Sequence, residues 1–394
     1  MELSKINKMD QAIFYCLCGV SLSTCLSIGA ASVFLGLAIL LFFCRLYIKR
    51  DDIGGFSHID RGLVGVTGLF FISILFSSAG AGEMLPGIRV FLDQCVYRVM
   101  PLILVLLLIK EKKKLAILAG LVLLSLTINS AGAIWQGIHG DFRATGPING
   151  IMVFSGILSI SLPLLLLTVM QTKAPVKKYV LSSLLIVTGG MLFNGTRSAW
   201  LTVLIVSVLV TFLASRNKKK YIAGSVVVFC FVGFVFANVP QLRERLNSIG
   251  DPTTNSRIER VFGWQGAWEM FRDHPLTGVG QGHYRELYKA QYKPLGARED
   301  LHHAHNNFMQ ILAESGIAGM VPYTLMMLYF LYYGFRGWVK GKNIYCLAFG
   351  GLTLGLILHG LADFNLAMSA VMKLYWLLAA LCIQMMNIDE ERFE

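Results

Sequence analysis

Residues 240–305 read PQLRERLNSIGDPTTNSRIERVFGWQGAWEMFRDHPLTGVGQGHYRELYKAQYKPLGAREDLHHAH. Five of the eight histidines of the chain lie in this polar stretch: His274, His283, His302, His303 and His305. Apolar segments flank it on both sides, and a segment of about 20 mostly apolar residues is long enough to cross a bilayer. A polar insert of this size predicts that the loop carries functional groups, since loops on a rigid scaffold present them.

The composition indicates an all-α polytopic membrane protein. Of the 394 residues, 55% are hydrophobic and 15% are charged, whereas soluble domains carry roughly 25% charged residues. The net charge of +12 does not indicate nucleic-acid binding, because most basic residues lie in short runs between the apolar segments. None of the eight cysteines lies in residues 240–305, so no disulfide framework is expected there.

We expect about twelve transmembrane helices, with boundaries soft by a few residues. They are predicted near 11–27, 29–47, 62–79, 88–109, 115–136, 148–170, 179–194, 197–215, 221–239, 306–334, 343–361 and 366–386. The segment at 88–109 is the weakest of these, because it contains charged residues. The chain is therefore divided into nine spans at 1–239, one large outer loop with short helices at 240–305, and three spans with the C-terminus at 306–394.

Short basic clusters in alternate connections predict the orientation in the membrane. With the N-terminus in the cytoplasm, the cytoplasmic connections carry these clusters: Arg45, Lys49, Arg50 and Arg61; Lys110, Lys112, Lys113 and Lys114; Lys173, Lys177 and Lys178; Arg216, Lys218, Lys219 and Lys220; Arg336, Lys340 and Lys342. Connection 80–87 has no Lys or Arg, and connection 137–147 has only Arg143. Twelve spans return the C-terminus to the cytoplasm and place residues 240–305 on the outer side.

The first polar group expected at the outer membrane face is in the stretch NGTRSAW, residues 194–200, between the seventh and eighth spans. Arg197 is expected near the start of a helix. Helix amides together with a guanidinium group make a good anion site, especially for phosphate. The alternative is an interfacial arginine whose side chain extends to the lipid headgroups.

A second polar group lies in the stretch NSRIERVFGW, residues 255–264. Apolar residues at near-helical spacing predict a helix over 257–272. Arg257 and Arg260 are three residues apart and are therefore neighbours on one face of that helix. The alternative is an ordinary solvated helix. The following segment HPLTGVGQG, residues 274–282, is rich in turn-forming residues and is expected to end the helix.

A third polar group is expected where the loop re-enters the membrane. His305 lies at this point, and Asn306 is placed to cap the next helix or to orient the histidine. A histidine there can act as a general base or donate a hydrogen bond to an anion. A metal site with His303 is the competing interpretation, but metals usually need further ligands and the loop has no Asp-x-Asp pair. We therefore expect no metal.

Two further pairs of ionisable residues lie within or beside predicted spans. His359 and Asp363 are four residues apart, and so are Arg89 and Asp93. The spacing predicts that each pair interacts on one helical face. Ionisable residues inside a membrane are functional candidates by default, although a purely structural pairing is an equally good interpretation.

Taken together, these elements resemble the O-antigen ligase and polymerase family of bacterial envelope glycosyltransferases. Ligases of that family show His followed by Asn, Ser or Gln, then nine residues, then Gly-x-x-Gly. Here His305-Asn306, nine intervening residues and the stretch GIAG at 316–319 match this spacing. The predicted topology, with twelve spans and the large loop after the ninth, is also similar to that of the family.

Two further elements carry the resemblance. The family shows a Thr-Arg-x-x-Trp-like element that opens a mid-chain span, and TRSAW at 196–200 fits it. Its outer loop shows a Ser-x-x-x-Arg-x-x-x-Trp element and an HPLTGVG-like segment. Ser256, Arg260 and Trp264 fit the first of these, and residues 274–280 fit the second.

The resemblance implies an inverting, metal-independent glycosyltransferase without a cofactor. Such enzymes move a glycan from undecaprenyl diphosphate to a sugar of the lipid A–core oligosaccharide, at the periplasmic face of the bacterial inner membrane. Arg197 and Arg260 would hold the diphosphate, and His305 would accept the proton of the attacking hydroxyl or orient it. The further substrate-binding candidates are Arg257, Asn306, His303 and Trp264.

Three alternatives stay open from the sequence. An O-antigen polymerase or a protein O-oligosaccharyltransferase of the same family would use the same donor chemistry with another acceptor. From a different class, the chain could be a transporter of lipid-linked oligosaccharides. Transporters use broken helices, charged residues near the membrane midplane and paired repeats, whereas the polar residues here concentrate on one side of the membrane.

Overall fold

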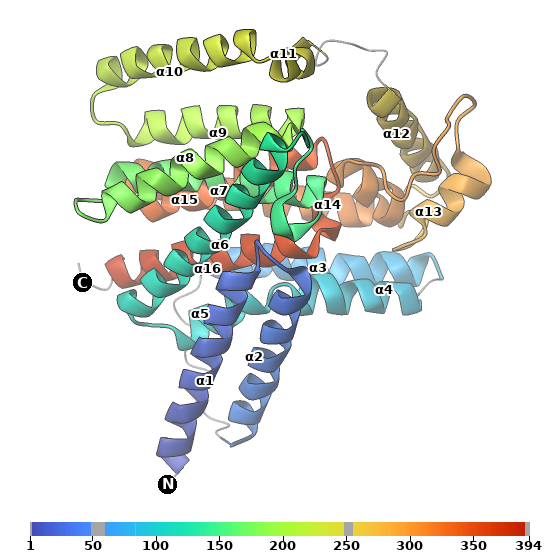
Figure 1. Ribbon diagram of the computed structural model, residues 1–394. Helices are drawn as coiled ribbons and strands as arrows, with labels where there is room; N and C mark the ends of the chain where they lie inside the picture. Colours follow the sequence, from blue (N-terminus) through green and yellow to red (C-terminus); the bar gives the residue numbers. More distant parts are fainter. Residues whose placement is uncertain (1, 49–59, 83, 248–254, 391–394) are drawn as a thin grey trace.

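The computed structural model describes residues 2–48, 60–82, 84–247 and 255–390. All regular secondary structure in these ranges is helical (Figure 1). Eleven of the twelve predicted apolar segments coincide with one helix each: α1 (Glu2–Ser23), α2 (Ile28–Ile48), α3 (Arg61–Gly80), α6 (Lys112–Ile138), α7 (Ile151–Gln171), α8 (Lys177–Asn194), α9 (Arg197–Ala214), α10 (Lys218–Asn238), α14 (Asn307–Gly341), α15 (Ile344–Gly360) and α16 (Ser369–Glu390). The segment near 88–109 is divided into α4 (Met84–Val90), the π-helical η2 (Phe91–Tyr97) and α5 (Met100–Leu108).

Within the described ranges, eight helical segments are long and apolar enough to cross a membrane. Helix α15 is apolar but has only 17 residues. The chain is therefore a multi-pass membrane protein. The count of twelve spans, their orientation and the division at 240 and 305 stay predictions.

Local signals place several of the helix ends. Helix α3 begins after Asp60, whose carboxylate accepts a hydrogen bond from Leu63 N at 3.0 Å. Helix α15 begins after Asn343, whose side chain accepts one from Tyr345 N at 2.9 Å. Such caps satisfy amide groups that have no partner within the helix. Helix α8 ends at Gly195, which takes the left-handed conformation (φ 64°) common at helix C-termini.

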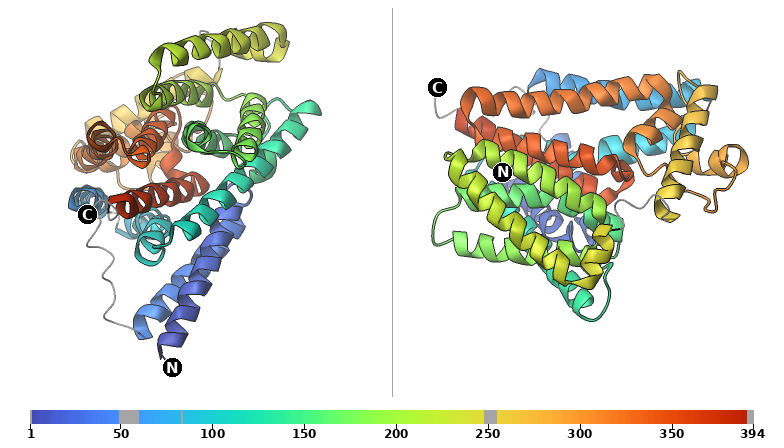
Figure 2. Two further views of the ribbon diagram at one scale, coloured as in Figure 1. Left: turned by 90° about the vertical axis from the view of Figure 1, so that its left-hand side faces the viewer. Right: turned by 90° about the horizontal axis from the view of Figure 1, so that it is seen from above.

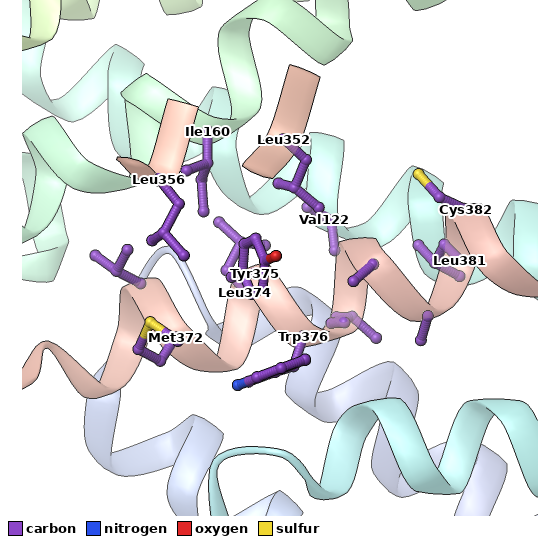
Figure 3. Close-up of a cluster of buried hydrophobic side chains, with 14 of the residues drawn as sticks. Val122, Ile160, Leu352, Leu356, Met372, Leu374, Tyr375, Trp376, Leu381 and Cys382 are labelled. Atoms are coloured by element: carbon purple, nitrogen blue, oxygen red, sulfur yellow. The ribbon is translucent and has the colours of Figure 1, made fainter. Parts of the chain in front are cut away.

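Helix α16 forms the centre of the bundle and packs against α5, α6, α7 and α15. Apolar side chains from several helices surround it, and Leu374 and Tyr375 on α16 itself are fully buried (Figure 3). Most of α16 is buried, as expected of a helix in the interior of such a bundle. Helices α1 and α2 pack on each other and extend at an angle from the bundle, whereas α10 lies at its edge beyond α9 (Figures 1 and 2).

The polar stretch folds into α11 (Pro240–Asn247), α12 (Asn255–Asp273), α13 (Tyr284–Leu287) and the π-helical η4 (Tyr288–Tyr292). The predicted helix over 257–272 is confirmed by α12. The loop has a small core of its own, in which the rings of Tyr284 and Tyr288 stack at 5.6 Å. The hydroxyl of Tyr284 donates to Gly263 O at 2.7 Å and so fixes α13 against α12.

The predicted pairing of Arg89 with Asp93 is wrong. Arg89 is exposed, and Asp93 forms an ion pair with Arg98, whose Nε lies 3.2 Å from Asp93 Oδ1. The π-helical geometry of η2 shifts side-chain positions relative to an α-helix, so residues five apart lie on one face here. Arg98 also donates to Leu366 O at 2.8 Å, so the ion pair connects η2 to the chain before α16.

Candidate active site

Helix α14 begins at the polar loop, and its first residues build one side of the site. Asn306 caps the helix, because its Oδ1 accepts hydrogen bonds from Phe308 N (2.8 Å) and Met309 N (3.2 Å). Its Nδ2 donates to Leu361 O at 3.0 Å and joins α14 to the end of α15. His305, directly before this cap, takes a left-handed backbone conformation (φ 48°). The capping role predicted for Asn306 is confirmed.

Helix α14 is broken at Gly316, which has non-helical dihedral angles (φ 57°, ψ −154°). Segment 275–280 of the loop supplies the four hydrogen bonds that the break requires. Val279 N and Gly280 N donate to the carbonyl groups of residues 313 and 314, at 2.9 and 3.1 Å. In turn, the amides of residues 317 and 318 donate to Pro275 O and Leu276 O, at 2.9 and 3.0 Å. The loop thereby replaces the helical bonds from residue 317 to 313 and from 318 to 314.

Side chains strengthen this attachment. Glu314 is buried, and its Oε1 accepts hydrogen bonds from Gly282 N (3.0 Å) and Tyr284 N (3.2 Å). Gln281 donates to the hydroxyl of Ser315. We call residues 275–284 the clasp. Because the clasp joins the loop to α14 about three turns from His305, it sets the position of α12 relative to that histidine.

A histidine–carboxylate pair lies at the start of α14. His305 Nδ1 is 3.1 Å from Oδ1 of Asp363. Asp363 lies in the connection between α15 and α16. Asp363 is 1% exposed, and its Oδ1 also accepts from Phe364 N at 2.8 Å. Burial alone would raise the pKa of Asp363, but the hydrogen bond from His305 and the nearby imidazoles hold that pKa below its ordinary value. The charged carboxylate therefore keeps the proton on Nδ1 and leaves Nε2 as an acceptor.

The predicted pairing of His359 with Asp363 is wrong. His359 is fully buried on α15, where Nε2 lies 3.0 Å from Ser155 Oγ and Nδ1 lies 3.5 Å from Asn365 Nδ2. Helix α15 ends at Gly360, so Asp363 is outside the helix and no longer on the face that carries His359. The carboxylate is thereby released for His305.

Arg260, one of the predicted arginines, interacts electrostatically with Asp363 and with a second predicted arginine, Arg197. Arg197 is the first residue of α9, and Arg260 lies half-buried on α12. Burial lowers the pKa of Arg260, the negative charge of Asp363 raises it, and the positive charges of Arg197 and Arg143 lower it further. Arg260 therefore lies within electrostatic range of charges from α9 and from the two connections that carry Arg143 and Asp363. Arg257 is exposed, so Arg260 is the loop arginine that faces the cluster.

His303 completes the surroundings of His305. The two rings meet edge to face with centroids 4.2 Å apart, and His303 Nδ1 accepts a hydrogen bond from His305 N at 3.3 Å. Burial, with an added contribution from the neighbouring His305, lowers the pKa of His303 to about 4. His303 is therefore neutral near pH 7. Trp264, by contrast, packs against the small core of the loop.

The site also contains a possible set of metal ligands. One ligand atom from each of His303, His305 and Asp363 can be chosen so that all lie within 4.8 Å of one another. Two imidazoles and a carboxylate suit a transition metal such as zinc. Both Nδ1 atoms are, however, already in hydrogen bonds, one with a main-chain amide and the other with the carboxylate. The absence of a metal stays a prediction.

Two residues of this cluster were missed as site residues from the sequence. Asp363 was assigned to the wrong partner. Arg143 was used only to predict the orientation of the chain in the membrane. Nothing local identifies Asp363 as the partner of His305, since the two are separated by the whole of α14 and α15. Arg143 had a weak signal, because it is the single basic residue of a predicted outer connection.

No curated protein matches the chain significantly. A sequence model of a family described as O-antigen ligase matches residues 182–324. The matched region contains Arg197, Arg260, His305 and the break in α14, and it ends before Asp363. This match supports membership of the chain in the O-antigen ligase family.

Proposed function

We propose that the protein is an O-antigen ligase, which transfers a glycan from undecaprenyl diphosphate to a sugar hydroxyl of the lipid A–core oligosaccharide. Family membership indicates a glycosyltransferase-type enzyme that acts on lipid-linked glycans in a membrane. The observation that carries the proposal is the convergence of two arginines and a histidine–carboxylate pair at one end of the bundle. We infer that this end is the periplasmic face of the bacterial inner membrane, with both termini in the cytoplasm.

In the proposed mechanism, the two arginines bind the diphosphate of the donor. Arg197 lies in the first turn of α9, where free helix amides add positive potential. Arg260 approaches from the loop and is partly withdrawn from water, which strengthens its interaction with an anion. As the glycosidic bond breaks, its electron pair leaves with the diphosphate. The guanidinium groups stabilise this growing charge, so the mechanism requires no bound metal or cofactor.

His305 acts on the acceptor. The acceptor oxygen attacks the anomeric carbon from the side opposite the diphosphate, which inverts the configuration. His305 Nε2 receives the proton of the attacking hydroxyl, and Asp363 stabilises the resulting imidazolium. His303 stays neutral beside it, so no additional positive charge opposes this proton transfer. Arg257, Asn306 and Trp264 stay lower-ranking candidates for contacts with the glycan, of which Asn306 already uses its amide to cap α14.

A gene deletion tests the function most simply. In a strain that makes O-antigen, loss of a ligase leaves bare lipid A–core and accumulates long glycan chains on the lipid carrier. Loss of a polymerase instead leaves core that carries single repeat units, and this result would contradict the proposal. Unchanged lipopolysaccharide, with unmodified surface glycoproteins, would favour the protein O-oligosaccharyltransferase.

Complementation of that strain tests the site. Arg197→Ala and Arg260→Ala are expected to leave the core bare with protein levels unchanged. Arg272→Ala is the matched control, because Arg272 is exposed on the same helix as Arg260 and pairs with Glu269 at 2.9 Å. This control should restore ligation fully. Restoration by Arg197→Ala at the wild-type level would refute the proposed diphosphate site.

A further inference from the structure

Arg143 lies in the connection between α6 and α7, which places a third arginine at the site. It is exposed, and it is the single Lys or Arg between residues 139 and 150. Its main-chain amide donates to Asp141 Oδ1 at 3.0 Å, which tightens the turn. Within the described part of the chain, its guanidinium group forms no ion pair. An exposed arginine that forms no ion pair is ordinarily a solvated surface residue. A role at the site requires that the backbone of Arg143 be held in a defined position.

The connection is held in place by two amide side chains of α6, of which Asn129 is fully buried. Gln136 Oε1 accepts hydrogen bonds from Thr145 N and Gly146 N, both at 2.9 Å. Asn129 Oδ1 accepts from Ile148 N at 2.9 Å, and its Nδ2 donates to Thr145 O at 3.1 Å. Four hydrogen bonds from two side chains thus fix residues 145–148. Such a loop is pre-organised and can present a side chain at a defined position.

The same connection is joined directly to the segment that carries Arg197. Ala144 N donates to Phe193 O at 3.2 Å, and Asn194 Nδ2 donates to Ala144 O at 3.1 Å. At Gly195 the chains approach so closely that a Cβ atom would lie 2.8 Å from the carbonyl oxygen of residue 142. The residues on both sides of Arg143 are therefore in contact with the chain just before Arg197.

The charges of the cluster agree with this backbone geometry. The positive charge of Arg143 is one of those that lower the pKa of Arg260. Arg143, Arg197 and Arg260 therefore come from three separate elements and converge. Asp363 is the acidic group that acts on Arg260, and it already pairs with His305. Like charges brought together repel each other, so this arrangement favours binding of an anion with more than one negative charge.

We propose that Arg143 is the third arginine of the diphosphate site and that it binds the leaving diphosphate. This inference rests on the proposed function. The donor diphosphate is esterified at both ends and gains one negative charge when the bond to the sugar breaks. A third guanidinium group therefore interacts more strongly with the transition state and the released diphosphate than with the bound donor. Interactions of that kind raise kcat rather than lower KM.

Binding of inorganic pyrophosphate to the full-length protein in detergent tests the inference separately from turnover. Calorimetry is expected to show a dissociation constant about 10-fold higher for Arg143→Ala than for the wild type, with Arg143→Lys in between. Arg285→Ala is the control, because Arg285 is exposed on α13 in the same loop system. This control should bind pyrophosphate as the wild type does. In transfer assays, Arg143→Ala should lower kcat about 10-fold or more and change KM for the donor less than about 3-fold.

The outcomes separate this inference from the proposed function. Arg143 is excluded if Arg143→Ala binds pyrophosphate like the wild type while Arg197→Ala and Arg260→Ala bind it weakly. In that case the diphosphate site stands with two arginines. If wild-type protein does not bind pyrophosphate and none of the three substitutions affects transfer, the inference and the proposed diphosphate site both fail.

Discussion

Replacing Asp363 by asparagine removes a negative charge from beside His305 with almost no change of shape. The asparagine Oδ1 can still accept the hydrogen bonds that Asp363 Oδ1 accepts from His305 Nδ1 (3.1 Å) and Phe364 N (2.8 Å). The second carboxylate oxygen, Oδ2, is buried without a hydrogen-bond partner in the described part of the chain. The substitution places an amide NH2 there. The backbone of the site should therefore survive, while the charge that stabilises an imidazolium is lost.

The size of the effect follows from the burial of the pair. Asp363 has a side-chain exposure of 1% and His305 one of 26%, so solvent screens the interaction only in part. A hydrogen bond to a charged group contributes about 1.5–3 kcal/mol. If that stabilisation is present only when His305 is protonated, kcat should fall about 10- to 150-fold. Because the pKa of Asp363 lies below its ordinary value, the carboxylate is charged throughout the neutral range, and the loss should persist across that range.

Steady-state kinetics with purified protein provide the assay. Asp363 acts through His305 and is a positioning residue, so KM for the lipid donor should change less than about 3-fold. Asp300→Asn is the matched control, because Asp300 is an exposed carboxylate that pairs with Lys293 at 2.8 Å. Its activity should equal that of the wild type. A folded Asp363→Asn variant with unchanged kcat would refute the role of the pair, and so would a variant that changed KM alone.

Two further predictions concern the clasp and the imidazoles. Gly316→Ala should cost about 2–4 kcal/mol, because φ 57° is strained for alanine and a Cβ would lie 2.5 Å from Leu276 O. Thermal unfolding measures this against Gly65→Ala, whose Cβ meets nothing within 4 Å, and equal midpoints would contradict the clasp. The pKa of His303 is about 4 when folded and about 6.5 when unfolded, so the unfolded state binds more protons between these values. The free energy of unfolding should therefore decrease as the pH falls from about 6.5 to about 4, and His303→Gln should weaken this pH dependence. An identical pH dependence in both proteins would contradict the lowered pKa of His303.

Much of the helical architecture could be predicted from composition and hydrophobic segments. Eleven of the twelve apolar segments each coincide with one helix and the twelfth is helical in three pieces, because apolar length and backbone hydrogen bonding leave few alternatives in a membrane. The two neighbouring arginines of α12 and the cap at Asn306 could also be predicted from the sequence, since both depend on residues less than one turn apart. The sequence could not predict which of Arg257 and Arg260 faces the site, because the spacing of two neighbouring residues does not show which side chain points inwards.

The contacts that build the site depend on residues distant in the chain. The pairing of His305 with Asp363 requires the end of α15 to return to the start of α14, and an i,i+4 spacing suggested the nearer His359 instead. The break in α14 was likewise hidden, because GIAG at 316–319 fits an unbroken helix with small residues on one face. Its cause is the loop segment inserted beside it, and a glycine motif alone does not specify its partner.

Transfer by purified, full-length protein tests the central claim most directly. The reaction would contain an undecaprenyl diphosphate-linked glycan, lipid A–core acceptor and EDTA, without a nucleotide or a membrane gradient. Mass spectrometry would follow the products. The proposed function predicts a ligated lipid A–core glycan and an equal amount of free undecaprenyl diphosphate, with the rate reduced about 100-fold or more in Arg197→Ala. Joining of donor glycans to each other without a core product, a requirement for added divalent metal, or a wild-type rate in Arg197→Ala would contradict it.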